Sequence, residues 1–199
     1  MIRISGGIHR GQRIYVPDDP NVRPTTGRVR EAVFNILGGQ LSGAWVLDLF
    51  AGSGLLGLEA LSRGAEFAVF VDSSPSACAM IRQNCERLRC THQAAVIQGT
   101  LPQTATLTKL QTLLQQKYQQ SDKRLGLLFL DPPYGRGLVP EVLSNIGKSI
   151  FIHPGTLAVA EHEAGAPLKD CTSWEPLQYR RYGDTRISIF SMIGEKDTT

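Results

Sequence analysis

Short apolar runs alternate with stretches of helical periodicity from about residue 44 onward. The apolar runs predict strands at 45–49, 67–71, 94–98, 125–130 and 156–161. Apolar positions that return every three or four residues predict helices at 55–63, 75–88, about 103–119 and 138–150. This alternation predicts an α/β fold, with a mostly parallel sheet and helices on both of its faces.

The two flanks of the chain follow other patterns. Residues 2–5 and 12–16 predict a small β-hairpin, and a helix is expected from Thr25 or Thr26 to the glycines at 38 and 39. Near the other end, 178–182 and 186–192 predict an antiparallel hairpin. We therefore expect an appendage at 1–24, one main domain at 25–195 and a disordered tail at 196–199.

Composition favours a single soluble domain. The chain has 199 residues, of which 42% are hydrophobic and 20% charged. No apolar run has the length of a membrane span and no signal segment opens the sequence, so a cytoplasmic protein is expected. Cys78, Cys85, Cys90 and Cys171 lack the spacing of metal ligands. We expect buried free thiols and no metal site.

Positive charge is concentrated in the first thirty residues. The net charge is +3, yet residues 1–30 carry six arginines against two aspartates. The rest of the chain holds fifteen basic and sixteen acidic residues, so the whole excess lies in this segment. Because arginine suits both bidentate phosphate contact and stacking on bases, the pattern indicates a nucleic-acid partner, although a plain solvated surface would also fit the charge alone.

The sequence Asp131-Pro132-Pro133-Tyr134 directly follows a predicted buried strand. The prolines carry no N–H and stiffen the turn, and their carbonyls and the Asp131 carboxylate are acceptors. Tyr134 offers a flat face for stacking. Such a group can hold a planar molecule by an exocyclic NH2, which an ordinary Asp-Pro turn would not require.

A second group of residues predicts a nucleotide site. Asp48 ends one strand and precedes the loop Phe50-Ala51-Gly52-Ser53-Gly54, which opens a helix, and Asp72 ends the next strand. Gly52, Gly54 and Gly57 match the dinucleotide pattern, but Asp48 would direct a negative charge toward a pyrophosphate. A cationic cofactor without phosphate, such as S-adenosylmethionine, fits this charge better.

These segments together resemble one known family. The run from Asp48 to Gly64 resembles motif I of the bacterial 16S rRNA guanine-N2 methyltransferases of the guanine(966)-N(2) type, and the Asp131–Tyr134 motif matches their catalytic motif. Residues 23–35 (RPTTGRVREAVFN) are similar to their N-terminal signature, and residues 182–185 (YGDT) to their C-terminal hairpin. The RPTTGRVREA segment is the most specific of these.

The resemblance implies a Rossmann-like, seven-stranded methyltransferase fold and methyl transfer from S-adenosylmethionine to a guanine N2 of 16S rRNA. The substrate would be the rRNA or a small-subunit assembly intermediate, and the enzyme a monomer. The catalytic residues would be Asp131, Pro132, Pro133 and Tyr134. The cofactor would contact Asp48, Phe50, Ala51, Gly52, Ser53, Gly54, Asp72, Ser73, Thr100 and Thr25. RNA would contact Arg3, Arg10, Arg13, Arg23, Arg28, Arg30, Tyr182 and Arg186, with Arg180 and Arg181 nearby.

The chain departs from the family pattern at two strand ends. Gln98-Gly99-Thr100 lacks the acid that many such enzymes place near the adenine, and Asp72 stands where many relatives have Glu. Other functions stay open at this point. They are a DNA adenine-N6 methyltransferase, another RNA amino-methyltransferase, a nicotinamide-dependent dehydrogenase and a non-catalytic RNA-binding module.

Overall fold

The structure is a computed structural model that describes residues 1–17, 27–119, 125–133, 135–165, 168, 171 and 173–193. The side chain of Arg28 is not among the described parts. The predictions for Arg23, Thr25, Thr26, Tyr134 and the tail at 196–199 fall outside these ranges, as does the expected boundary between residues 24 and 25.

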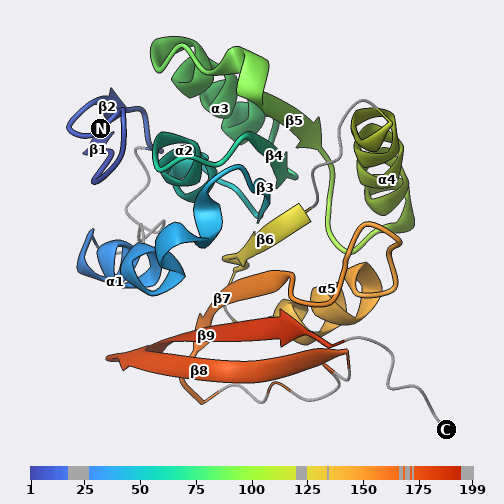
Figure 1. The fold of residues 1–199 in the computed structure, drawn as a ribbon. Coiled ribbons are helices and arrows are strands. Elements are labelled where there is room, and N and C mark those ends of the chain that lie inside the picture. Colours follow the sequence, from blue (N-terminus) through green and yellow to red (C-terminus); the bar gives the residue numbers. More distant parts are fainter. Residues whose placement is uncertain are drawn as a thin grey trace, which may run out of the picture.

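A seven-stranded sheet forms the centre of the molecule (Figure 1). Its strands lie in the order β5-β4-β3-β6-β7-β9-β8; the first five are parallel, while β9 and β8 run antiparallel. The strands are β3 (Trp45–Leu49), β4 (Phe67–Asp72), β5 (Ala94–Gln98), β6 (Leu125–Leu130), β7 (Leu157–Glu163), β8 (Trp174–Tyr182) and β9 (Thr185–Met192). This confirms the expected architecture, a Rossmann-like, mostly parallel seven-stranded sheet with a C-terminal antiparallel hairpin.

Helices cover both faces of the sheet and bury a separate apolar cluster on each. One face packs against α1 (Gly27–Leu37), α2 (Leu55–Ser62) and α3 (Pro75–Arg87), and the other against α4 (Thr104–Tyr118) and α5 (Leu138–Ile146). Two short 3-10 helices, η1 (Gly38–Leu41) and η2 (Thr91–Gln93), connect α1 to β3 and α3 to β5. Alternating side chains of β3 and β6 belong to the two clusters, because successive side chains of a strand point to opposite faces.

The strand order reverses between β3 and β6. From β3 the chain moves outward through β4 to β5, then returns to place β6 on the other side of β3. In open α/β sheets, ligands bind at the carboxyl ends of the strands where the order reverses. Asp48 and Asp131 lie at or directly after the carboxyl ends of these two strands, so the fold brings the two predicted motifs together.

The N-terminal hairpin packs directly on α2. Its strands, β1 (Ile2–Arg3) and β2 (Arg13–Ile14), are antiparallel, and the buried Ile4 and Ile14 belong to the same cluster as α1 and α2. Gly7 has a φ of +74°, and a Cβ there would lie 1.7 Å from the Ser62 carbonyl oxygen. The hairpin was predicted, but its close contact with the main domain was not.

Cys78, Cys85 and Cys90 are buried, as the sequence indicated, whereas Cys171 is only half-buried. In the described ranges, no cluster of three or more His, Cys, Asp or Glu residues could hold a metal ion. No helix there is both long and apolar enough to cross a bilayer.

Candidate active site

Asp72 holds the loop after β3 in place. Its Oδ2 accepts the backbone N–H of Gly52 at 2.8 Å, and its Oδ1 accepts that of Ser74 at 2.8 Å. One carboxylate therefore joins the glycine loop to the start of α3, where the Ser74 side chain caps the helix. The predicted cofactor loop and the acid at the next strand end thus form one connected site.

The glycines of this loop serve the backbone and the packing of α2. Gly52 and Gly54 both have a positive φ, and so does Phe50, at +65°. A Cβ on Gly57 would lie 2.3 Å from the Phe70 ring, so α2 packs closely on β4 only with glycine there. The left-handed conformation of Phe50 is strained for a residue with a side chain, which is typical of loops that shape a site.

Asp48 is buried rather than open to the ligand. Only 2% of it is exposed, and its Oδ2 accepts the Gly57 N–H at 2.8 Å. Burial raises the pKa of Asp48 to about 8; the Gly57 N–H lowers it, while the charges of Asp131 and Asp72 raise it further. The prediction that Asp48 presents a full charge to the ligand therefore needs correction, because every residue of β3 is buried.

Asp131 and Pro132 lie beside the cofactor loop. The N–H of Asp131 approaches the Leu49 carbonyl at 3.5 Å, which continues the pairing of β6 with β3. Asp131 is half-buried and close enough to Asp48 to raise that residue's pKa. Asp131 thus directly follows a strand that lies between β3, which leads into the predicted cofactor loop, and β7.

A cavity of about 380 Å³ opens beside the same motif. Pro132 and Pro133 line it together with the beginning of α5 and the end of β7, including Glu161, His162 and Glu163. The His162 ring lies 2.9 Å from both the Glu163 carbonyl and Ser188 Oγ. Burial lowers the pKa of His162 and the charge of Arg186 acts in the same direction, while the hydrogen bond with the Glu163 carbonyl opposes them.

The remaining predicted cofactor residues follow the strand ends. Ala51 is buried and donates its N–H to the Val71 carbonyl, and Ser53 is half-buried in the loop. Ser73 and Thr100 are exposed just after β4 and β5. All lie at the carboxyl edge of the sheet, where the fold places a ligand.

The predicted RNA-contacting arginines do not share one environment. Arg3, Arg10 and Arg13 are exposed on the N-terminal hairpin. Arg30 is only 4% exposed; its Nε lies 3.5 Å from Glu59 Oε2, and it donates a 3.0 Å hydrogen bond to the Arg3 carbonyl. The structure therefore places Arg30 in the interior, where its guanidinium holds the hairpin and is not exposed to a phosphate.

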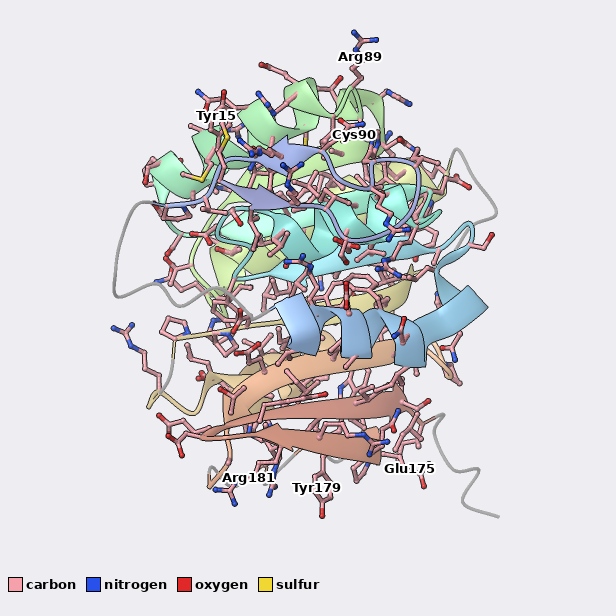
Figure 2. All side chains as sticks on the ribbon, turned by 90° about the vertical axis from the view of Figure 1, so that its left-hand side faces the viewer. Tyr15, Arg89, Cys90, Glu175, Tyr179 and Arg181 are labelled. Carbon is pink, nitrogen blue, oxygen red and sulfur yellow. The ribbon has the colours of Figure 1, made fainter. Side chains whose placement is uncertain are left out.

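The C-terminal hairpin lies at the opposite end of the molecule from the N-terminal one. Tyr182 and Arg186 are half-buried there, and the Arg186 guanidinium lies 4.8 Å from the centre of the exposed Tyr179 ring. Figure 2 shows Tyr15 at one end and Tyr179 with Arg181 at the other. The two sets of predicted RNA residues are thus not one patch.

Sequence reasoning missed two buried polar side chains that fasten the N-terminal hairpin. Glu59 is fully buried in α2 and accepts hydrogen bonds from the Ser5 N–H and hydroxyl and the Gly6 N–H, at 2.7–2.8 Å. Arg63 pairs with the same carboxylate at 2.9 Å. Asn84 of α3 is equally buried. The signal for Glu59 was its place in an otherwise apolar helix, where a carboxylate requires partners.

Comparison with known proteins identifies the class. A family model described as "Conserved hypothetical protein 95" matches residues 2–191. The chain resembles the solved structure of yhhF from Escherichia coli, whose name places it among the methyltransferases. The TM-score is 0.76 with 29% identity, and the match covers 98% of this chain and 99% of that one. An RNA methyltransferase from Salinibacter ruber in complex with S-adenosyl-L-homocysteine shares the fold, with TM-score 0.58 at 16% identity over 89% and 98% of the chains. Fold and site together define a Rossmann-like methyltransferase.

The particular family follows from a curated relative. The chain is 35% identical over 163 residues to the ribosomal RNA small subunit methyltransferase D of Escherichia coli, a match that covers 82% of this chain and 75% of the relative. The chain belongs to this family, which confirms the resemblance carried by its motifs.

Proposed function

We propose that this protein transfers a methyl group from S-adenosylmethionine to the N2 amine of a guanine in 16S rRNA, free or in an assembling small subunit. The observation that carries the proposal is the meeting of the cofactor loop with Asp131 at the switch point of the sheet. The name of the Escherichia coli relative supports the substrate, because that protein acts on small-subunit rRNA.

The residues present fit S-adenosylmethionine. Ribose hydroxyls would donate to the remaining lone pairs of Asp72, and the backbone of Gly52–Gly54 would lie against the ligand. The Asp131 carboxylate favours a cation in this crevice, and a bound cation would in turn favour the ionised form of the buried Asp48. When bound, this cofactor supplies a methyl group already activated by its sulfonium.

The amine of guanine needs assistance because its lone pair is delocalised into the ring. Asp131 and the Pro132 carbonyl would accept the two N2 hydrogens and so direct the lone pair at the methyl carbon. They would also stabilise the positive charge that develops on nitrogen. Asp131 would also take up the proton that the N2 amine loses when it is methylated. Tyr134 is proposed to stack on the base, which must first leave its own stack.

The lining of the 380 Å³ cavity favours guanine over adenine. Glu161 and Glu163 add carboxylate acceptors beside Pro132 and Pro133. Guanine presents N–H donors at both N1 and N2, whereas adenine presents an acceptor at N1 that carboxylates would repel. The register of β6 with β7 aligns Leu130 with Ala160, so Asp131 and Glu161 come next on neighbouring strands and share a face.

Asp131→Ala tests the catalytic assignment. We expect S-adenosylmethionine binding by calorimetry to be retained, while transfer of labelled methyl to small-subunit rRNA falls about a hundredfold or more, because the amine loses an acceptor. Glu175→Ala, a carboxylate lost from an exposed position on β8, serves as the control and keeps full turnover. Unchanged turnover in Asp131→Ala, or N6-methyladenine as the digestion product, would contradict the proposal.

A further inference from the structure

A single buried side chain joins the N-terminal hairpin segment to the cofactor loop. Asn84 of α3 is 0% exposed. Its Oδ1 accepts the Tyr15 N–H at 2.7 Å, and its Nδ2 donates to the Tyr15 carbonyl at 2.9 Å and to the Ser53 carbonyl at 3.0 Å. Both backbone groups of Tyr15 are therefore tied to the same amide that holds the loop at Ser53.

The other side of Tyr15 faces the molecular surface. Its side chain is 38% exposed, and the Arg87 guanidinium lies 5.5 Å from the centre of its ring. Arg87 also donates a 2.6 Å hydrogen bond to the Arg13 carbonyl. Figure 2 shows Tyr15 and Arg89 at the same end of the molecule, where α3 lies beside the hairpin. An exposed tyrosine among arginines suits RNA, through stacking on bases and contact with phosphates.

The loop side of Asn84 is part of the cofactor site. Ser53 lies between Gly52, whose N–H is held by Asp72, and Gly54, whose N–H donates to the Ala51 carbonyl at 2.7 Å. A restraint on the Ser53 carbonyl therefore restrains the glycine backbone that the cofactor approaches. Asn84 is within hydrogen-bond distance of both partners at once, so no intermediate residue is needed.

We propose that Asn84 is a positioning residue that couples rRNA binding at the Tyr15–Arg87 surface to S-adenosylmethionine binding at the Gly52–Gly54 loop. The inference rests on the proposed function. RNA that orders Tyr15 also orders Asn84 and, through it, Ser53. The loop then loses less conformational entropy when the cofactor binds. The effect is reciprocal, and bound cofactor strengthens RNA binding by the same factor.

The test measures the affinity for S-adenosylmethionine with and without a saturating 16S rRNA fragment, by calorimetry on the full chain. In the wild type we expect RNA to tighten cofactor binding by about fivefold or more. Asn84→Asp keeps the acceptor for Tyr15 but loses both donated bonds, so the ratio should fall toward one. Ser62→Ala is the matched control, because Ser62 anchors the hairpin at Gly6 and His9 without contacting the loop. It should weaken RNA binding and keep the ratio.

Each outcome decides the inference. Binding of both ligands by the wild type without coupling, or an unchanged ratio in Asn84→Asp, would overturn it and leave the proposed function standing. A wild type that binds the cofactor but no rRNA would overturn the proposed function and the inference together.

A second measurement needs no variant. Amide hydrogen exchange of Gly52, Ser53 and Gly54 in the wild type should slow when rRNA is added in the absence of cofactor. If RNA leaves the exchange of these three amides unchanged, the inference is contradicted, because RNA bound at the hairpin would then not restrain the loop.

Discussion

At the scale of single residues, burial changes what each carboxylate does. Asp72 is partly exposed and is held by two backbone N–H groups, which keeps it available to a ribose. Asp48 lies in a fully buried strand, and burial raises its pKa to about 8. Glu59 is also fully buried but is matched by Arg30, Arg63 and the Ser5–Gly6 backbone. A carboxylate thus faces the proposed ligand site, carries a raised pKa or fastens a hairpin according to its surroundings.

The raised pKa of Asp48 predicts a pH dependence of cofactor binding. A cationic ligand favours the ionised carboxylate, so below pH 8 binding must also remove a proton. Affinity for S-adenosylmethionine should therefore rise from pH 6 to pH 8, by at most about tenfold per pH unit, and then level off. Asp48→Asn keeps an acceptor for the Gly57 N–H but cannot ionise, so this rise should be absent in calorimetric titrations. An equal rise in both proteins would show that Asp48 does not couple to the ligand.

At the scale of elements, α2 connects the cofactor loop to the N-terminal hairpin. Its first residues follow Gly54, and its last turn holds the hairpin through Glu59 and Ser62. Gly57 allows it to lie close to β4. The helix is thus a short rigid link between a ligand loop and a surface with exposed arginines.

Two glycines of the hairpin offer a matched test of its docking. Gly7 and Gly11 both have a positive φ, but only at Gly7 would a Cβ meet the Ser62 carbonyl; at Gly11 it would meet open space. Gly11→Ala should cost about 1 kcal/mol of unfolding free energy, the ordinary penalty for a left-handed alanine. Gly7→Ala should cost at least about 1–2 kcal/mol more in denaturant melts, and it should weaken RNA binding. Equal effects would mean that the hairpin does not depend on this contact.

The sequence predicted the bounds of the strands in the parallel part of the sheet well and those of the edge strand β8 less well. Strands at 45–49, 94–98 and 125–130 have the predicted bounds, because each is a continuous apolar run in the parallel part of the sheet. β8 begins four residues earlier than expected, since this edge strand is exposed on both faces and has a bulge between Pro176 and Gln178. Hairpin docking through Glu59 and Asn84 could not be predicted, because it depends on contacts between residues more than fifty positions apart.

At the scale of the whole molecule, the N-terminal hairpin packs on α2, whereas the C-terminal hairpin forms the β9–β8 edge of the sheet, and the two lie toward opposite ends of the molecule in Figure 2. The proposed active site is at the switch point between β3 and β6. Exposed arginines occur on both, including Arg10 and Arg13 at one end and Arg180 and Arg181 at the other. This arrangement fits a small enzyme that recognises the shape of a folded RNA.

The placement of charge predicts how salt affects RNA binding. Replacing Arg10 and Arg13 by Gln should make the slope of log affinity against log salt shallower by about 1.4–1.8, since each lost phosphate contact removes about 0.7–0.9. As a control, replacing Lys109 in α4 and Lys148 just after α5 by Gln removes the same charge from exposed positions over the opposite face of the sheet. This double variant should leave the slope unchanged. Equal slopes for the two double variants would show that the hairpin arginines do not contact phosphate.

The most direct test of the central claim is mass mapping of small-subunit rRNA from cells that lack this protein. The account predicts that one N2-methylguanosine disappears from 16S rRNA, that the wild-type gene restores it and that Asp131→Ala does not. An unchanged set of 16S rRNA methylations, or the loss of N6-methyladenine from DNA instead, would contradict it.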